Sequence, residues 1–307
     1  MKKLLLAICI LYAGAGYAQR VSVSEVIPVT QKIDGQYFFP RFSPGDDKIF
    51  FSSSNYNGLW YADQQQKAIT PFVSEQGAGY EFAFSRDGKS VVYRVNEYSE
   101  KGIKISQKIV KKNIETNEQQ IIETGRYLSS PKVLVNNEIV YTKDNKMVVK
   151  SSSSSRNVVK AEPFVYIENT KMVYYDNGVK KVLSPLGDVH YIWPSLSPDK
   201  TKLLFSALGI GTFITDVNGK VLVSLGEARY PRWSPDGKWV SYMIDEDDGH
   251  VITSSELYVV SADGKTKFQL TDTKDRIEMY AEWANTSNDL VFHSDEGQIF
   301  VMKLKID

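Results

Sequence analysis

Cysteine is almost absent from this chain: its 307 residues contain one, Cys9, which lies in a short apolar run at the N-terminus. The remainder can therefore form neither a disulfide nor a thiol-based site. No apolar run approaches the roughly 20 residues that a transmembrane helix needs. Neither charge is in excess, because 37 Lys and Arg balance 37 Asp and Glu. Without a basic surface, the composition gives no reason to expect nucleic acid as a partner.

Helical patterns and catalytic signatures are missing as well. No convincing amphipathic helix appears, and no Gly-x-Ser-x-Gly elbow is present. The glycine pairs at 77/79 and 209/211 precede strand-like segments, whereas phosphate-binding loops precede helices. The sequence therefore predicts an all-β protein without a complete catalytic motif.

The first 18 residues have the pattern of a signal peptide. Lys2 and Lys3 precede the apolar stretch 4–12, and Gly16 and Ala18 supply small residues at the −3 and −1 positions of a cleavage site. The single cysteine is not preceded by the small residue that a lipoprotein needs. We therefore expect cleavage after residue 18 and export of residues 19–307 to the bacterial periplasm or cell surface, without a membrane anchor.

A short motif recurs along the rest of the chain, most completely as Pro-Arg-Trp-Ser-Pro-Asp-Gly-Lys at 231–238. Pro-Asp-Gly is a tight-turn signal, because Pro presets φ and Gly supplies a positive φ. A run rich in β-branched and aromatic residues follows each copy, so each copy predicts a β-hairpin. Repeats start at positions 40, 82, 131, 163, 194, 231 and 281.

Four-stranded units of roughly 40 residues predict a β-propeller, whose radial packing protects the sheet edges. Seven starts favour seven blades, whereas merging the two short central units would give six. The last unit has only three strands, and the segment Val23–Thr30 is a spare strand before the first unit. We expect that N-terminal strand to complete the last blade and close the ring. We also expect Phe42, Phe84, Trp233 and Trp283 to be buried between blades.

The segment from Tyr230 to Lys238, with the strand Ser255–Val260 and a second Asp-Gly turn, resembles the Pro-Asp propeller repeat of TolB-like proteins. The similarity is strong at 40–96 and 190–304 and weak at 125–185. It implies a propeller domain alone, because the α/β domain that precedes the TolB propeller has no room here. TolB-like repeats occur in periplasmic envelope proteins, in propellers of prolyl-oligopeptidase-type peptidases and in oligogalacturonate-lyase-type enzymes.

Aromatic residues recur just before or at the first strand of the units. Repetition at one topological position would gather their rings at one mouth of the central channel, where they could bind a partner, although packing between blades would also explain each one. The candidates for this binding surface are Tyr37, Tyr80, Tyr127, Tyr191, Trp193, Tyr230 and Tyr280.

Histidines and an acidic run supply a candidate metal site. The three histidines occupy positions from which they could reach one face of adjacent blades, and the run 245–248 contains four carboxylates. The candidate ligands are His190, His250, His293, Asp245, Asp247 and Asp248. The alternatives are that His293 is a blade residue, that the other two histidines are exposed loop residues, and that the acidic run is solvated.

Two functions follow from these features. The first is an exported, monomeric and non-enzymatic propeller of the cell envelope that binds a protein or saccharide at one face, without a cofactor. The second is a lyase or hydrolase acting on acidic oligosaccharide with a divalent metal such as Ca or Mn, a use of histidines that the resemblance to oligogalacturonate lyases implies. An accessory propeller of a separate peptidase is a further possibility.

Overall fold

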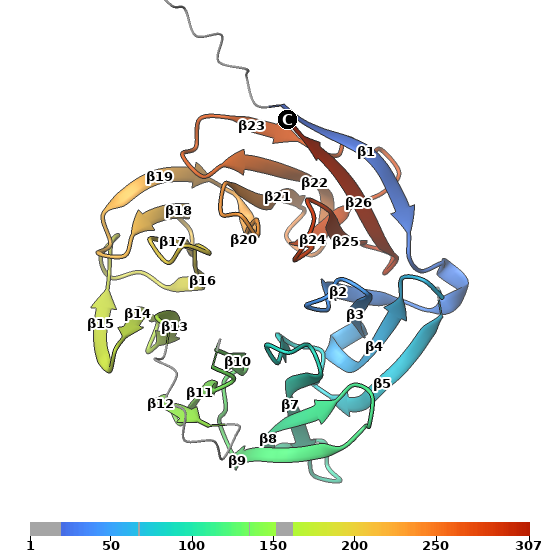
Figure 1. Ribbon diagram of the computed structural model, residues 1–307, viewed down its shortest axis with the longest axis vertical. Helices are drawn as coiled ribbons and strands as arrows, with labels where there is room; N and C mark the ends of the chain where they lie inside the picture. The colour runs from blue at the N-terminus through green and yellow to red at the C-terminus, as the bar shows by residue number, and fades with distance from the viewer. Residues whose placement is uncertain (1–19, 67, 135, 152–161) are drawn as a thin grey trace, which may run out of the picture.

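The structure is a computed structural model that describes residues 20–307 except residues 67, 135 and 152–161. The predicted signal peptide lies outside the described residues. Strands account for nearly all regular structure, and the short 3-10 segments η1 (Lys32–Asp34) and η2 (Ser54–Tyr56) are the only helical turns in the described part. The strands form seven sheets around a ring, so the protein is a seven-bladed β-propeller, as the repeats predict (Figure 1).

Each blade begins close to a predicted repeat start. Blade one contains β2 (Tyr37–Phe42), β3 (Lys48–Ser53), β4 (Asn57–Asp63) and β5 (Ile69–Gln76). Blade two contains β6 (Ala83–Phe84), β7 (Ser90–Tyr98), β8 (Lys104–Asn113) and β9 (Gln119–Gly125). Blade three contains β10 (Lys132–Val133), β11 (Ile139–Lys143) and β12 (Lys146–Lys150), and blade four contains β13 (Phe164–Glu168), β14 (Lys171–Asp176) and β15 (Val179–Leu183).

The later blades are regular. Blade five contains β16 (Tyr191–Leu196), β17 (Lys202–Ala207), β18 (Gly211–Asp216) and β19 (Val221–Gly226). Blade six contains β20 (Arg229–Trp233), β21 (Trp239–Asp247), β22 (Ile252–Ser261) and β23 (Lys267–Gln269). Five of the seven sheets thus have four strands, whereas blades three and four have three in the described residues. The two short central units are therefore separate blades.

Blade seven closes the ring with strands from both ends of the chain. It contains β24 (Glu278–Trp283), β25 (Leu290–Ser294) and β26 (Ile299–Ile306), and its outermost strand is β1 (Val21–Pro28). β1 pairs antiparallel with β26 from Val21 opposite Ile306 to Pro28 opposite Phe300. The predicted closure by the N-terminal strand is therefore confirmed.

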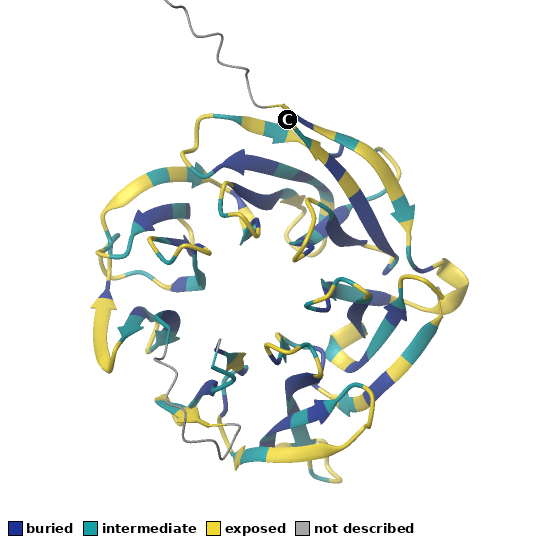
Figure 2. Cartoon of the chain, in the orientation of Figure 1, coloured by how far each residue is buried: buried dark blue, intermediate teal, exposed yellow. Residues whose placement is uncertain are grey.

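The core lies between the blades. The middle strands of each sheet are the most buried, whereas outer strands such as β9, β15 and β19 are largely exposed (Figure 2). Phe42 and Trp283 are buried, as the sequence predicts. Phe84 and Trp233 are only half-buried. Trp239, at the start of β21, is instead the largest fully buried side chain.

A serine and an aspartate hold five hairpin turns, two of them in blade six. The serine hydroxyl donates to the aspartate and accepts a hydrogen bond from the backbone N–H five residues further on, as Trp239 N does to Ser234 Oγ at 3.0 Å. These bonds satisfy polar groups that the turn buries. The pairs, with hydroxyl–carboxylate distances of 2.6–2.7 Å, are Ser43–Asp47, Ser85–Asp87, Ser197–Asp199, Ser234–Asp236 and Ser261–Asp263.

These turns predict loss of stability in acid. The hydrogen bond from Ser197, together with bonds from Thr201, lowers the pKa of Asp199 to about 2. Hydrogen bonds from the turn serines likewise lower the pKa values of Asp87 and Asp263. Because the folded pKa values lie below the unfolded value of about 4, the stabilisation is complete above pH 4 and lost as the pH falls toward 2. Urea midpoints should therefore decrease over this range. Asp199→Asn should show a smaller decrease than the unsubstituted protein, and an equal decrease would contradict this account.

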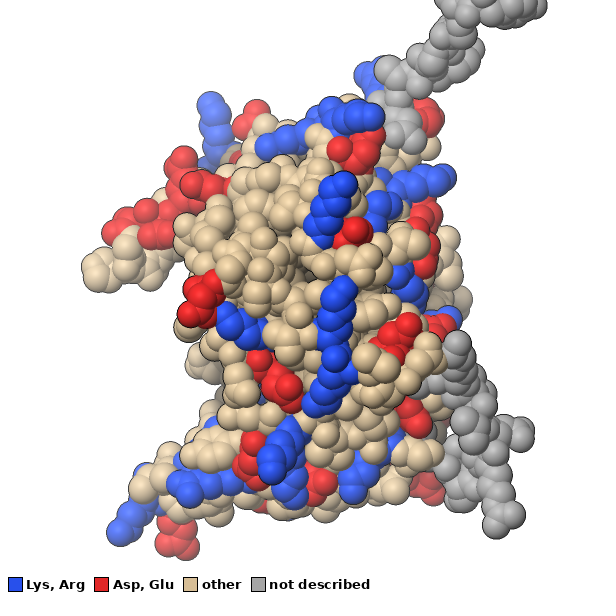
Figure 3. Space-filling model, turned by 90° about the vertical axis from the view of Figure 1, so that its left-hand side faces the viewer, with Lys and Arg blue, Asp and Glu red and all other residues tan. Residues whose placement is uncertain are grey.

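Two hairpins are longer than those of the other blades. The hairpin of β7 and β8 ends in a turn in which Ser99 N–H donates to Ile103 O. The hairpin of β21 and β22 ends in a turn in which Asp248 N–H donates to Val251 O. Both turns join the second strand of a blade to the third, so both lie at the same end of the ring. Two projections accordingly stand out on one side of the molecule (Figure 3). We call these two hairpins the arms, and this end of the ring the arm face.

Candidate functional site

The innermost strands of four blades contain a β-bulge at the same place. The strand register shifts between Phe38 and Arg41 in β2, and equivalent shifts occur in β16, β20 and β24. A residue within each bulge has a left-handed backbone, and in all four blades it is aromatic. These residues are Phe39 (φ 55°), Trp193 (φ 52°), Tyr230 (φ 52°) and Tyr280 (φ 57°).

The left-handed backbone is unfavourable for side chains of this size. Such a conformation costs on the order of 1–3 kcal/mol per residue, and it is a true outlier for a bulky residue. A bulge also changes the direction in which a side chain points. Bulges that re-aim a side chain occur next to functional sites, and this one repeats with an aromatic residue in four blades. The repetition indicates that the position of these rings, rather than backbone stability, is what the sequence maintains.

The four rings form a continuous arc with Tyr56 and Tyr80. Neighbouring ring centroids lie 4.7–6.0 Å apart, the spacing of stacked and edge-to-face aromatic pairs. The order around the ring is Tyr80, Tyr56, Phe39, Tyr280, Tyr230 and Trp193, which spans five consecutive blades. We call this group the aromatic arc. Tyr56 belongs to the connection between β3 and β4, so the arc lies toward the arm face.

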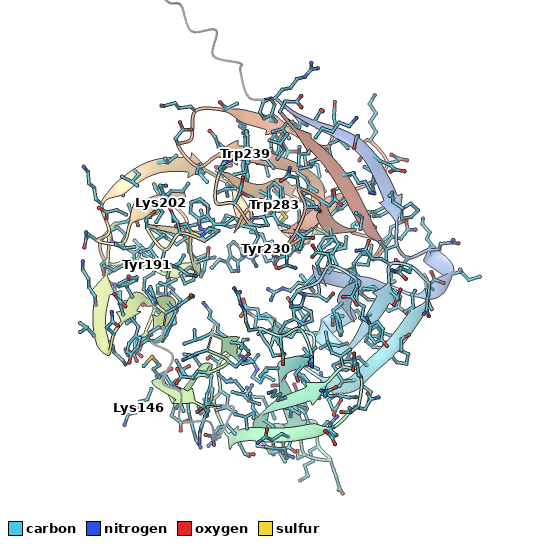
Figure 4. All side chains as sticks on the ribbon, in the orientation of Figure 1. Lys146, Tyr191, Lys202, Tyr230, Trp239 and Trp283 are labelled. Carbon is cyan, nitrogen blue, oxygen red and sulfur yellow. The ribbon has the colours of Figure 1, made fainter. Side chains whose placement is uncertain are left out.

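The aromatic arc lines a cavity of about 150 Å³. Figure 4 shows Tyr230 reaching toward the centre of the ring, whereas Lys146 points away from it. Burial raises the pKa of Tyr56 to about 12, and it also raises the pKa values of Tyr80 and Tyr280. Arg41, Glu81 and other residues of blades one and two complete the lining. The site is therefore a cavity lined mainly by aromatic rings, with charged groups in its wall.

A charged network lies against the arc. Glu282 Oε1 accepts hydrogen bonds from Tyr230 Oη at 2.8 Å and Arg232 Nε at 2.7 Å, and it lies 3.6 Å from Arg41 Nε. The Arg232 guanidinium stacks on Tyr230, 3.6 Å from the ring centroid. Burial alone would raise the pKa of Glu282, but the charges of Arg232 and Arg41 lower it. Glu282 is therefore ionised and ties together blades one, six and seven.

The predicted aromatic residues divide into two groups. Tyr80, Trp193, Tyr230 and Tyr280 come together in the aromatic arc. Tyr37 and Tyr191 do not join it. Tyr37 packs on Phe51 and Trp60 within blade one. Tyr191 is 1% exposed and packs on Phe205. These two tyrosines therefore serve packing, the alternative to binding that the sequence left open.

Tyr127 also lies apart from the arc. It is 56% exposed and has Lys104 and Arg126 over its ring. The residues that the sequence does not single out are Phe39, Tyr56, Arg41, Arg232 and Glu282. One sequence signal could have found Phe39: an aromatic residue directly precedes Pro40, Pro194 and Pro231. In each case this residue lies in the bulge that turns its ring toward the cavity.

The candidate metal ligands are dispersed. No group of three or more His, Cys, Asp or Glu side chains in the described part of the chain is arranged to hold a metal ion. His293 is 1% exposed within blade seven, where its ring stacks on Tyr280 at 5.3 Å, and burial lowers its pKa to about 4. His190 and His250 are exposed.

The acidic run is part of the blade-six arm. Asp245 pairs with Arg229 at 2.8 Å, and the backbone N–H groups of His250 and Val251 donate to Asp248. The third candidate carboxylate of this group, Asp247, accepts from the N–H of Gly249. Asp247 and Asp248 thus shape the turn of the arm, whereas Asp245 is paired with Arg229 of the neighbouring strand β20.

No protein-family model and no curated protein matches this chain, whereas many solved structures do. TolB from Acinetobacter baumannii aligns with a TM-score of 0.50 and 18% identity, over 78% of this chain and 55% of that one. Oligogalacturonate lyase from Vibrio parahaemolyticus aligns with a TM-score of 0.50 and 13% identity, over 90% of this chain and 79% of that one. The propeller domain of Cps50 (Swd1) from Myceliophteria thermophila aligns with a TM-score of 0.60 and 10% identity, over 92% of this chain and 99% of that one.

What these proteins share is the β-propeller fold. The identities are too low to show more, since one propeller scaffold supports many unrelated functions. This chain spans about half the length of the TolB that it matches. Within the described residues, no helix is both long and apolar enough to cross a membrane.

Proposed function

We propose that this protein is a binding propeller that holds a segment of a partner protein against the aromatic arc. The observation that carries the proposal is the recurrence of an aromatic side chain at four left-handed bulge positions around one cavity. Tyrosine and tryptophan supply large contact areas at low cost in side-chain entropy, and they dominate many binding interfaces. Backbone strain that is maintained in several blades needs such a compensating role.

The surroundings of the arc favour a protein over a saccharide. The loops of the arm face expose aliphatic side chains, which gain by burial against an apolar partner surface. The exposed residues of this kind are Ile103 and Ile105 in one arm, Leu208 and Ile210 between β17 and β18, and Val251 in the other arm. A protein segment in the cavity would thus meet aromatic rings, while the flanking parts of the partner would meet these loops.

The proposed place of action is the bacterial cell envelope. The signal-peptide pattern of residues 1–18 supports export, and the fold is similar to that of TolB. Export can be tested independently of binding. The chain, expressed in a Gram-negative host, should be recovered from the periplasm with Gln19 as its first residue. Recovery of the full-length chain from the cytoplasm would contradict this part of the proposal.

Binding is tested with a displayed library of unstructured peptides selected against residues 19–307. The dissociation constant of a selected peptide should rise at least tenfold in Tyr56→Ala and in Trp193→Ala, about 1.4 kcal/mol for each lost ring. Tyr127→Ala is the matched control, because that tyrosine is exposed and lies outside the arc. Its affinity should equal that of the unsubstituted protein.

Two outcomes would overturn the proposal. Selected peptides that bind all three variants equally would show that the aromatic arc is not the binding surface. Failure to select any peptide, together with tight binding to acidic oligosaccharides on a glycan array, would favour the saccharide alternative. Metal content and lyase activity, measured on the same protein, would then decide whether that saccharide is a substrate.

A further inference from the structure

Beneath the aromatic arc, one register position of the inner strands supplies a layer of charged side chains. Arg41 in β2 lies opposite Phe50 of the second strand, and Lys132, Arg232 and Glu282 occupy the equivalent position in blades three, six and seven. In each blade this residue lies two or three positions before the hairpin turn. Four blades therefore contribute a charge at the same depth in the ring.

Cations outnumber carboxylates in this layer. Glu282 is shared by Arg232 and Arg41, so one negative charge faces the three positive charges of the layer and two of these remain uncompensated. Lys132 forms no ion pair in the described part of the chain, and its Nζ donates only to the backbone carbonyl of Val165 at 2.9 Å.

Many donors of the layer remain unused. A guanidinium carries five N–H groups and an ammonium three. Arg41 donates from Nη1 to Phe82 O at 2.8 Å, and Arg232 donates from Nε and Nη1. Both guanidinium groups also have Tyr230 as a side-chain hydrogen-bond partner. The layer thus offers several N–H groups to an acceptor that comes from outside.

The surroundings make this excess charge costly. The side chain of Lys132 is exposed to solvent, although the protein that rings it removes part of the water around its ammonium group. Burial lowers its pKa, Glu81 partly opposes this change, and the positive charges of Arg232 and Arg41 add to it. Arg94 lies behind Tyr80, 5.4 Å from its ring centroid, and adds a fourth cation near Glu81. Like charges held in a partly buried space favour the arrival of an anion.

We propose that the layer formed by Arg41, Lys132 and Arg232 binds a carboxylate group that enters through the aromatic arc. The inference rests on the proposed function in one respect: the molecule that carries this carboxylate is the segment of a partner protein that the arc binds. The carboxylate is then the C-terminus of that segment or one of its acidic side chains. Glu282 provides the internal precedent, because Arg232 and Tyr230 already hold its carboxylate by charge-assisted hydrogen bonds. A ligand with an aromatic body and one carboxylate would match both parts of the site.

The test uses N-acetylphenylalanine, which has both features, and N-acetylphenylalaninamide, which lacks the negative charge. Calorimetric titration of residues 19–307 at pH 7 and low salt should show saturable binding of the acid, with the amide at least tenfold weaker. Lys132→Met should weaken binding of the acid at least tenfold, whereas Lys132→Arg should retain it. Lys146→Met is the matched control from the same blade, because Lys146 points outward, away from the centre of the ring (Figure 4).

Each outcome bears on the inference. Equal binding of acid and amide, or unchanged binding in Lys132→Met, would overturn it. Inorganic phosphate that binds more tightly than either probe, at equal ionic strength, would overturn the carboxylate assignment. Acetate that binds as tightly as the aromatic acid would show that the carboxylate site acts alone and would contradict a carrier held by the arc. If the aromatic acid binds but no library peptide is selected, the proposed function fails while the carboxylate site stands.

Discussion

Deletion of β1 is expected to abolish the cooperative unfolding of the whole domain. β1 supplies the outer strand of blade seven through a ladder that joins the first and last strands of the chain. The connection after it adds further closure, since Ile299 O accepts from the N–H of Val29 and Thr30, and Thr30 Oγ1 accepts from Ile299 N. Without β1, the edge of β26 is left unpaired and its apolar face loses its cover.

The measurement compares a chain that starts at residue 19 with one that starts at residue 29. Thermal melts followed by circular dichroism should give one sharp transition for the first chain. The second should show a broad transition, or a midpoint lower by more than about 10 °C, because the ladder and its apolar contacts are lost together. A synthetic peptide of residues 19–31 added to the truncated chain should restore part of the midpoint. An unchanged melt of the truncated chain would show that β1 does not close the ring.

The architecture could be predicted because its signals are local. The turn at Pro235, Asp236 and Gly237 specifies a hairpin through the preferences of three consecutive residues, and similar turns recur at blade intervals. Ser234 adds a hydrogen bond that fixes the same turn. Closure followed from counting strands, since a final unit with three strands needs a fourth. Such inferences need no knowledge of how distant residues pack.

The candidate site could be predicted only in part because one bulge decides which ring points inward. In blade one, Tyr37, Phe38 and Phe39 are consecutive, and the pattern alone cannot choose among them. The structure buries Tyr37 in the blade and directs Phe39 into the arc. Because side chains alternate between faces of a strand, a shift of one residue reverses every assignment. Trp193 and Tyr191 in blade five differ in the same way.

Other members of the site are distant in sequence. Tyr56 reaches the arc from the connection between β3 and β4, and its stacking on Phe39 depends on the non-helical turn of η2. Lys132 and Glu282 lie in blades three and seven, and as single charged residues they are unremarkable in the sequence. Only the strand register shows that they share one layer. Sequence motifs find repeated local chemistry, whereas this layer is made of different residues at one repeated position.

Glu282→Ala is expected to destabilise the protein by about 3–5 kcal/mol, the cost of breaking a buried ion pair from one side. Its side chain is 16% exposed, and its removal would leave Arg41 and Arg232 without a counter-charge and Tyr230 without its acceptor. Urea unfolding at pH 7 measures the loss. Glu296→Ala is the control, because its pair with Lys32 is exposed on both sides and should contribute no more than about 1 kcal/mol.

A second substitution and an added anion separate the loss of charge balance from the loss of packing. Arg232→Met in the Glu282→Ala background removes one uncompensated cation and should recover part of the lost stability. Acetate, which can replace the missing carboxylate, should also raise the urea midpoint of Glu282→Ala more than chloride at equal ionic strength. If neither change restores stability, Glu282 acts mainly through packing, and the excess positive charge of the layer is not what an anion would relieve.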